Sequence, residues 1–562
     1  MVIKNSLLRF SVSTLLSMLV VQACSSTPSP NSTFTPSIPL ASTQSSMGTV
    51  SPNPPVTQTP NPSPSPGITH PGPSFPRLGM WWPNGWHQPL EDIARYDWVI
   101  LGNWQQQFIG PLLSINPNIE LLTSTDAAEL HYYPDDAASN EAILKIPCQW
   151  FLTQVGSTLR ADIDATQTTI LVNTLTAGNI FKSISLFRAG DSALIENESV
   201  YIQNVDKARN TLTVIRGYIR PASAHKAGTR IAAHVYTWPD TWMLNVSTLS
   251  PLAVADASVG PEIWPEYNAR VGLHLLDDPR WYGILIDRAD TDQSRYINRT
   301  TVRSIDPDQS NRLLSDYSTF DTAWNNGMRL YLDDLRQAIG PRRIIFLNWG
   351  VEDYQTVNGN NFEGFPDDLG GLGDNSWHSV VIGPFHRGSY FDWVKKSPQP
   401  NITMIETYEE NNVPSGPYVN RCKQPGFRPN YRKMRFGLTT ALLNDGYFSY
   451  EMSTYGHGSL CLMWFDEYDN AGTGRGYLGY PLGDAQLVES ARLSPHATGV
   501  DIWQRDYENG TVLVNATSKP ITISLENPMR KIKGSQDPTV NDGSLVTQVT
   551  LQPVDGIILL NP

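Results

Sequence analysis

The chain has 562 residues, too many for a single hydrophobic core, so its length predicts about two to four domains. Its composition, 40% hydrophobic and 10% aromatic, is that of a globular protein. The formal net charge of −13 argues against nucleic acid or an anionic membrane surface as the main binding partner.

The N-terminal residues resemble a bacterial lipoprotein signal. Lys4 and Arg9 give a positive charge, residues 10–21 are mostly apolar, and the sequence VQAC then ends at Cys24. We therefore expect residues 1–24 to be a signal peptide. We also expect an exported protein that faces the cell exterior or the periplasm and is anchored in a membrane through lipid on Cys24. An ordinary signal peptide, or a short anchor with an incidental cysteine, is the alternative.

The next segment, residues 25–75, is made largely of Ser, Thr, Pro and Asn, as in TPNPSPSPG. It contains almost nothing to bury, so we expect a disordered linker that holds a folded domain away from the membrane. No later segment has the roughly 18–20 uninterrupted apolar residues that a membrane-spanning helix requires.

Eight short apolar runs then resemble buried parallel strands, and most are separated by helical or loop segments. The runs are 78–82, 98–101, 119–124, 283–288, 344–349, 360–365, 402–407 and 447–451. Helices are expected over 89–96, 322–339, 390–397 and 431–445. This order predicts an α/β protein with a (β/α)8 TIM barrel, formed by residues 76–153 and 237–490. The link between the fifth and sixth strands is too short for a good helix.

Two regions depart from this rhythm and alternate apolar with polar residues, as antiparallel strands do. Residues 154–236 follow the third barrel strand and predict a small inserted all-β module, either a self-contained module or a lid or spacer. Residues 491–562 predict a compact C-terminal antiparallel β-domain.

Barrel enzymes carry their working groups at the C-terminal ends of the strands. In this chain those ends carry polar residues, mainly acids, with several tryptophans beside them. Two carboxyl groups that flank a glycosidic oxygen, together with aromatic rings that hold the sugars, form a sugar-cleaving site. The pattern therefore predicts such a site at the barrel mouth.

The preferred acids are Asp287, after the fourth strand, and Glu363, after the sixth. Strands two positions apart can face each other across the mouth, so Asp287 is predicted as the nucleophile and Glu363 as the acid. Glu406 is the third candidate. Asp287 could instead cap a helix or pair with Arg288, Glu363 could cap the next helix, and Glu406 could lie on a solvated edge. The residues predicted to bind substrate are Trp82, Trp86, Arg288, Asn348, Trp349, Glu451, Trp464, Asp466 and Glu467.

The sequence contains no motif for another chemistry or for a cofactor: P-loop, GxGxxG, HExxH and GxSxG are all missing. Cys148, Cys422 and Cys461 form no CxxC pair, so no metal is expected. One disulfide could form in an exported protein, but the sequence does not select the pair.

The motifs resemble bacterial glycoside hydrolases of the hypothetical glycosyl hydrolase type. They are LGMWW, GILIDR, NNFEGF, MRFGLTTALLNDGYFSYE, MWFDEYDN and IWQRDYENGTVLVN, and the likeness covers residues 76–153 and 237–562. The resemblance implies a (β/α)8 barrel with a terminal β-domain, hydrolysis of a glycosidic bond, and Asp287 and Glu363 as the acids. Two features depart from the family pattern: the insert, and the motif FEGF, in which an Asn-like residue is expected after the Glu. Both departures affect which substrate the resemblance implies, and not the class of enzyme.

We therefore expect a retaining glycoside hydrolase that acts on a poly- or oligosaccharide and needs no cofactor. The alternative is a non-catalytic, carbohydrate-binding surface lipoprotein built on the same barrel. A polysaccharide lyase or deacetylase would need metal or base clusters that the sequence does not contain.

Overall fold

The computed structural model describes residues 72–81, 88–178, 183–291, 293, 305–314, 316–366, 376–385, 387–409, 422, 424–452, 461–488 and 502–562. The predicted signal peptide, including Cys24, and nearly all of the predicted linker lie outside these ranges. Within them, no helix is both long enough and apolar enough to cross a bilayer.

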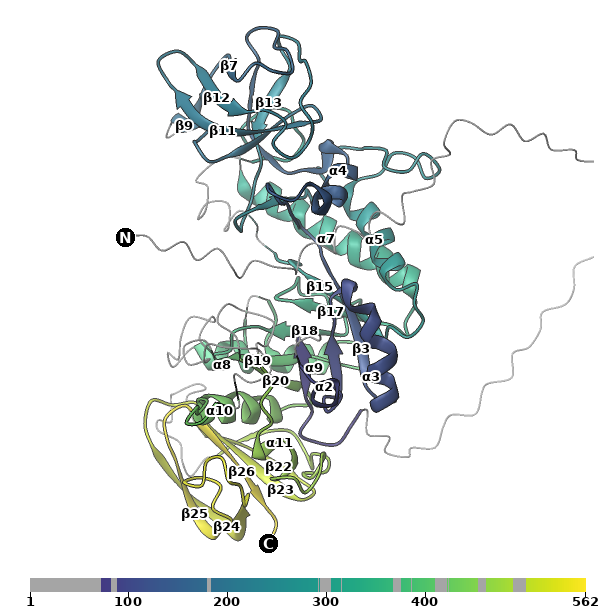
Figure 1. The fold of residues 1–562 in the computed structure, drawn as a ribbon. Coiled ribbons are helices and arrows are strands. Elements are labelled where there is room, and N and C mark those ends of the chain that lie inside the picture. Colours follow the sequence, from purple (N-terminus) through teal and green to yellow (C-terminus); the bar gives the residue numbers. More distant parts are fainter. Residues whose placement is uncertain are drawn as a thin grey trace, which may run out of the picture.

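Eight parallel strands form the central sheet (Figure 1). In spatial order they are β1 (Gly79–Trp81), β2 (Trp98–Ile100), β3 (Glu120–Asp126), β15 (Gly283–Asp287), β17 (Ile344–Asn348), β18 (Gly359–Phe362), β19 (Met404–Tyr408) and β20 (Tyr447–Glu451). A parallel bridge between Leu78 and Phe448 joins the last strand to the first. The sheet therefore closes into a TIM-barrel-like fold, as predicted, and each strand boundary lies within three residues of the end of its predicted apolar run.

The helices of the barrel follow their strands in the order expected. They are α2 (Leu90–Ile93), α3 (Ile109–Ile115), α5 (Trp264–Leu275), α7 (Tyr317–Ile339), α8 (Ser376–Val381), α9 (Tyr390–Lys396), α10 (Tyr431–Leu442) and α11 (Asp466–Asp469). Side chains cap three of them: Asp316 begins α7, Ser389 begins α9 and Asn430 begins α10. The link between β17 and β18, residues 349–358, contains no helix, as its length predicted.

Side chains alternate between the inside and the outside of the barrel. On β15, Leu285 belongs to the cluster that fills the barrel, whereas Ile284 and Ile286 pack into the larger core under the helices. Asp287 is two residues after Leu285, so its side chain has the same inward parity but lies at the open end. Three consecutive aliphatic residues and a following carboxylate are thus the expected pattern for a strand that is covered on both faces and ends at the mouth.

The segment between β3 and α5 contains a separate antiparallel sheet with its own hydrophobic core. In spatial order its strands are β6 (Ser157–Thr158), β13 (Arg230–Ala233), β10 (Ser192–Ile195), β11 (Glu198–Asp206), β12 (Thr211–Ile215) and β7 (Thr169–Leu171). A further pair, β8 (Thr176–Gly178) and β9 (Ser183–Ser185), lies within the same segment. We call residues 154–236 the insert, and its boundaries remain a prediction from the sequence.

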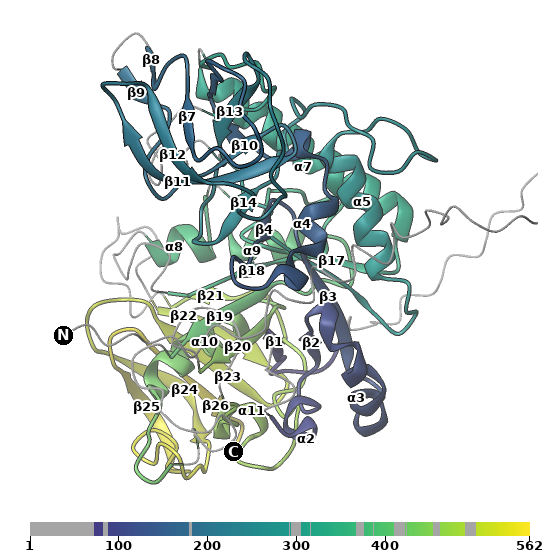
Figure 2. The same cartoon turned by 45° about the horizontal axis from the view of Figure 1, so that its top comes forward.

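Short elements connect the insert to the barrel. They include η2 (Ala137–Asn140), α4 (Glu141–Lys145) and η3 (Cys148–Trp150), besides η1 (Asn103–Phe108) before α3. Strand β4 (Glu129–His131) pairs with β14 (Thr241–Met243), and β5 (Thr153–Gln154) pairs with β16 (Ile305–Asp306). In Figure 2 the β4–β14 pair lies between the insert sheet and the barrel.

The last sheet consists of β21 (Gln486–Leu487), β22 (Ile502–Tyr507), β23 (Gly510–Asn515), β26 (Asp555–Leu560), β24 (Ile521–Lys531) and β25 (Leu545–Leu551) in spatial order. It packs on α10, where buried Arg435 pairs with Asp555 at 3.1 Å and with Asp537 at 2.6 Å. A Cβ on Gly556 would lie 1.9 Å from the Thr439 hydroxyl oxygen, so this contact tolerates no side chain. Figures 1 and 2 show this sheet and the insert at opposite ends of the molecule.

Glu120, at the start of β3, should make the free energy of unfolding depend on pH. Burial raises its pKa to about 7, and a hydrogen bond with Tyr282 opposes this rise only in part. Because the folded state holds this proton more tightly than the unfolded state, wild-type stability falls as pH rises from about 4.5 to about 7. We expect Glu120→Gln to raise the free energy of unfolding by about 1–3 kcal/mol at pH 8, measured by chemical denaturation.

The gain from Glu120→Gln should disappear near pH 4, where Glu120 is protonated in both states. Glu91→Gln, which removes an exposed carboxylate on α2, is the control and should change stability little at either pH. An equal effect of Glu120→Gln at both pH values would contradict the prediction.

Candidate active site

Polar side chains gather at the C-terminal ends of the barrel strands. Asp126 of β3 stands in register with Asp287 of β15, and Asn348 of β17 stands in register with Asn361 of β18. On the other side, Tyr408 of β19 pairs in register with Glu451 of β20. Parallel register thus brings strand ends that are far apart in the sequence to one edge of the barrel.

One amide group joins the two predicted catalytic acids. The side-chain nitrogen of Asn348 donates to Asp287 Oδ1 at 3.1 Å and to Glu363 Oε2 at 2.7 Å. Asn348 is buried, whereas both carboxylates are half-buried. Because both oxygens bind one nitrogen atom, they can lie no more than about 6 Å apart. The structure therefore brings Asp287, Asn348 and Glu363 together.

Two further side chains, which are not among the predicted site residues, complete this group. The Tyr408 hydroxyl donates to Glu363 Oε1 at 2.9 Å. The Asn361 amide donates to Asn348 Oδ1 at 3.1 Å and also to Glu406. Asn361 is two residues before Glu363, and Tyr408 two residues after Glu406, so strand alternation could have identified both.

Glu406, the third predicted catalytic acid, is fully buried behind Asn361. Its side chain is thus linked to Asn348 through the Asn361 amide, and Asn348 in turn contacts Asp287 and Glu363. Glu451 is also fully buried, and it accepts from the main-chain nitrogen of Trp81 at 3.1 Å. In register, Glu406 pairs with Ser449 of β20, and Glu451 pairs with Tyr408 of β19.

The residues that follow Asp287 and Asn348 adopt a left-handed backbone conformation. Arg288 has a φ of 53° and Trp349 a φ of 48°, which side chains other than glycine rarely adopt. In proteins such strain concentrates at functional sites. The Arg288 main-chain nitrogen donates to Asp287 Oδ1 at 2.8 Å, so this turn also holds the carboxylate.

The Arg288 guanidinium is held by a buried ionic network. It pairs with Asp290 at 2.7 Å and with Glu129 at 3.6 Å, and it donates to the Thr237 hydroxyl at 3.3 Å. Burial acts to lower the pKa of Arg288, but the neighbouring carboxylates outweigh it and raise that pKa above its usual value. Arg288, predicted to bind substrate, therefore also braces the loop after β15.

Asp290 connects this loop to the next one. Buried Arg387 contacts Asp290 at 3.3 Å and donates to the main-chain oxygen of Trp349 at 3.2 Å. The half-buried Trp349 ring packs on Phe362 and Phe385 at centroid distances of 5.4 and 6.1 Å. These contacts fix the loops beside the acid pair.

Two acids next to the pair bind protons tightly. Burial raises the pKa of Asp126 well above its usual range, and the nearby carboxylates of Asp287 and Glu129 raise it further. Burial also raises the pKa of Glu129 to about 7, against the opposing effect of Arg288. The raised pKa of Asp126 favours its neutral form, which places less negative charge beside Asp287.

Three residues predicted to bind substrate are engaged away from this group. Arg95 lies 3.5 Å above the Trp464 ring, whose nitrogen donates to Asp469 at 2.7 Å. Asp466 accepts from the main chain of Gln536 at 2.9 Å, and Glu467 accepts from Asn541 at 2.8 Å. Asp466 and Glu467 therefore attach the C-terminal sheet region to the barrel.

The two remaining residues predicted to bind substrate, Trp82 and Trp86, lie outside the described residues. Among the residues that the structure does describe, no cluster of three His, Cys, Asp or Glu side chains has the arrangement of a metal site. A disulfide joins Cys422 to Cys461, which resolves the pairing that the sequence left open. It links the loops that follow β19 and β20 at the barrel mouth.

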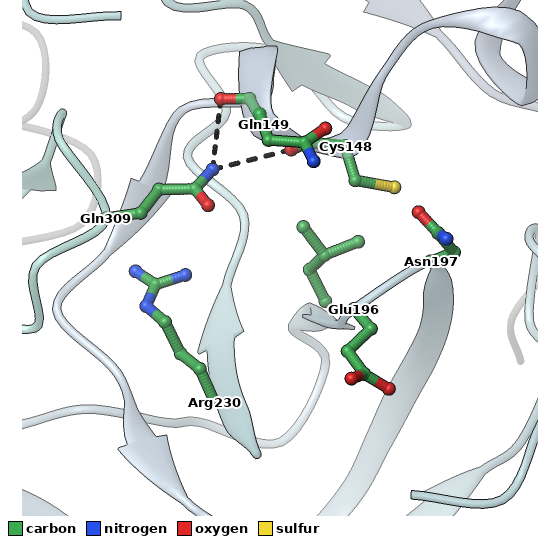
Figure 3. Close-up of a pocket in the computed structure, with 7 residues that line it drawn as sticks. Cys148, Gln149, Glu196, Asn197, Arg230 and Gln309 are labelled. Carbon is green, nitrogen blue, oxygen red and sulfur yellow. Dashed lines mark hydrogen bonds between the residues drawn. The ribbon is translucent and has the colours of Figure 1, made fainter. Parts of the chain in front are cut away.

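A pocket of about 280 Å³ lies beside the base of the insert, lined by Cys148, Gln149, Leu194, Glu196, Asn197, Arg230 and Gln309 (Figure 3). Its charged groups are already engaged: Glu196 contacts His225 at 2.7 Å, and Arg230 pairs with Asp306 at 2.6 Å. Burial raises the pKa of the Cys148 thiol, which makes this thiol a weak nucleophile. The strand-end acids are therefore the stronger candidate site.

The family model described as hypothetical glycosyl hydrolase family 15 matches residues 224–511. No curated protein matches the sequence. Among solved structures, an Anoxybacillus α-amylase is similar at 12% identity and a TM-score of 0.34, covering 84% of this chain and 89% of its own. Eubacterium rectale Amy13B is similar at 8% identity and a TM-score of 0.39, covering 88% of this chain and 97% of its own. The glycoside hydrolase domain of PelA from Pseudomonas aeruginosa is similar at 12% identity and a TM-score of 0.31, covering 69% of this chain and 100% of its own.

Proposed function

The chain belongs to hypothetical glycosyl hydrolase family 15, and we propose from that premise that it hydrolyses glycosidic bonds with Asp287 and Glu363. One observation carries the choice of residues: a single Asn348 amide binds a carboxyl oxygen of each acid. Two carboxyl groups held this close at a barrel mouth match the requirement of glycoside hydrolysis.

In the proposed first step, the Asp287 carboxylate attacks the anomeric carbon and forms an ester bond to the sugar. The bond from that carbon to the glycosidic oxygen breaks, and Glu363 donates its proton to the leaving oxygen. In the second step, water attacks the anomeric carbon, Glu363 takes up a proton from that water, and the ester to Asp287 breaks. Both carboxyl groups then return to their starting states.

The surroundings of the two acids support this division of roles. Asp287 accepts from the Arg288 main-chain nitrogen at 2.8 Å and is attracted to the Arg288 guanidinium, and both contacts favour a carboxylate. Glu363 accepts from the neutral Tyr408 hydroxyl and from the Asn348 amide. Asp287 is therefore the better nucleophile and Glu363 the better proton donor.

The spacing supports retention of the anomeric configuration. Retaining enzymes hold their carboxyl groups about 5–5.5 Å apart, whereas inverting enzymes need about 6.5–9.5 Å to admit a water molecule. The shared Asn348 amide limits the nearest oxygens to about 6 Å. This distance favours a covalent intermediate on Asp287.

Incubation of the protein with a panel of polysaccharides tests this function. Release of reducing ends from one of them, with the initial product in the anomeric configuration of the substrate by NMR, is the expected result. Binding to a polysaccharide without any release of reducing ends would instead support a carbohydrate-binding lipoprotein. Inversion of configuration would contradict the nucleophilic role of Asp287.

We also propose that the protein is exported and anchored by lipid on Cys24, as VQAC and the Ser/Thr/Pro-rich linker indicate. Replacement of Cys24 by Ser removes the thiol that would carry the lipid. We expect Cys24→Ser to move the protein from the detergent phase to the aqueous phase in Triton X-114 partitioning. The control is Cys148→Ser, which should partition as the wild type does, and unchanged partitioning of Cys24→Ser would exclude the lipid anchor.

A further inference from the structure

An aromatic surface connects the barrel mouth to the insert. It consists of Tyr132, Tyr201, Tyr218, Tyr236 and Trp238, which we call the aromatic strip. Trp238 is 59% exposed, and the four tyrosines are partly buried. An exposed tryptophan among further aromatic residues is unusual on a protein surface without a binding role.

The strip begins next to Thr237, a residue that contacts Arg288. The Thr237 hydroxyl accepts from Arg288 at 3.3 Å, and Arg288 is the residue after Asp287. The Thr237 main-chain nitrogen donates to Glu129 at 3.2 Å, so the segment is fixed at two points. Trp238 follows directly, and its main-chain oxygen accepts from Thr241 at 2.8 Å. Trp238 is therefore one residue away from a side chain that contacts the loop of the proposed nucleophile.

The strip continues onto the insert. The Tyr132 main-chain nitrogen donates to the oxygen of Asp240 at 2.9 Å, which joins Tyr132 to the segment that carries Trp238. The rings of Tyr132 and Tyr218 are 5.9 Å apart, and those of Tyr218 and Tyr201 are 5.0 Å apart. Tyr236 lies near enough to Tyr132 to affect its ionisation. The surface thus runs from the mouth across the β4–β14 pair to strand β11 of the insert.

The strip is rigidly supported from below. Buried Trp242 packs on Tyr132 at 5.0 Å and stacks on His234 at 4.0 Å, and its nitrogen donates to Ser192 of the insert at 2.7 Å. A surface that is already ordered loses little conformational entropy when a ligand binds.

The chemistry of the strip fits a glycan. Aromatic rings pack against the apolar C–H faces of sugar rings, while their polar edges remain in water. Carboxylates accept hydrogen bonds from sugar hydroxyls, and both Asp240 and Asp135 lie close enough to Tyr218 to influence it. A sugar chain needs both kinds of group at short intervals, and the strip together with these two neighbouring acids supplies both.

We propose that the aromatic strip binds the part of the glycan chain that extends from the reacting bond, with Trp238 as its main platform. This inference rests on the proposed function, because it places the reacting bond at Asp287 and Glu363. The insert then takes part in substrate recognition, since Tyr201 and Tyr218 belong to it. Remote binding of this kind selects long chains over short ones.

Native electrophoresis through gels that contain a polysaccharide tests the strip separately from hydrolysis. The probes are soluble starch, pullulan, xylan and glycol chitosan, and the full chain carries Glu363→Gln so that the probe stays intact. We expect at least one polysaccharide to retard the protein. Trp238→Ala should weaken that binding at least about tenfold, whereas Trp238→Phe should restore most of it. Leu482→Ala removes an exposed hydrophobic side chain far from the strip and should have no effect.

With Glu363 intact, Trp238→Ala should raise KM at least about tenfold on the polysaccharide that is cleaved and leave kcat unchanged. Lack of retardation by all four probes, or equal retardation of the wild type and Trp238→Ala, would overturn the proposal. If retardation depends on Trp238 but no reducing ends are released, the result supports glycan binding by the strip and rejects hydrolysis. Hydrolysis with an unchanged KM in Trp238→Ala rejects the strip alone.

Discussion

Asp287→Asn and Glu363→Gln should each lower kcat at least about 10³-fold on the polysaccharide that the wild type cleaves. Asp287→Asn removes the negative charge that forms the ester, and Glu363→Gln removes the proton that the leaving oxygen requires. Both replacements keep the shape of the side chain, and the two carboxylates are half-buried, so the melting temperature should change little. Reducing-end assays and calorimetry measure these two results.

Azide, a small nucleophile, can be used to distinguish the roles of the two acids. Azide should restore part of the activity of Glu363→Ala and of Asp287→Ala, and the anomer of the glycosyl azide identifies the missing residue. If Glu363 is the acid, its variant gives a product with the anomeric configuration of the substrate. If Asp287 is the nucleophile, its variant gives the opposite configuration.

Asp277→Asn removes an exposed acid that precedes the same strand, and it should leave kcat unchanged. Near-normal turnover of both Asp287→Asn and Glu363→Gln would show that the pair is structural. Glu406 would then be the next acid to test, because the Asn361 amide links it to Asn348.

Asn348→Asp should lower kcat by about 10²–10³-fold. The replacement has nearly the same shape, but it puts an oxygen where the amide nitrogen now binds Asp287 at 3.1 Å and Glu363 at 2.7 Å. A third carboxyl group between two others disfavours ionisation of all three. The acidic limb of the pH–kcat profile should therefore move to higher pH, a change that mere loosening of the fold would not produce.

Asn348→Ala is the matched control, because it removes the amide without adding an acid. It should lower kcat less than Asn348→Asp, by about 10–10²-fold, and leave the acidic limb nearer its wild-type position. Identical pH profiles for the two variants would contradict the electrostatic role of this amide and leave Asn348 as a packing residue.

Much of the barrel could be predicted because the relevant physics is local. A parallel strand that is covered on both faces must be largely apolar, so runs such as residues 283–287 can be recognised as strands from the sequence. Alternation then indicates that Asp287 points inward two residues after Leu285. The same rule would have identified Asn361 and Tyr408, which were not among the predicted site residues.

Other expectations could not be resolved locally. Trp464, Asp466 and Glu467 have the composition of a sugar site. In the structure, however, they contact Arg95 and residues 536–541 of the C-terminal region. An acid that holds two domains together and an acid that holds a sugar have the same sequence signature. The difference lies in which distant segment covers them.

By itself, the sequence determined the order of the eight barrel strands and the place of Asp287 at the end of its strand. These follow from residue periods of two and 3.6 and from the need to bury apolar side chains. Tertiary structure alone decided that Asn348 binds both acids, that Thr237 and the aromatic strip meet the mouth, and that Cys422 pairs with Cys461. Those contacts depend on strand register and barrel closure, which bring together groups that are up to hundreds of residues apart in the chain.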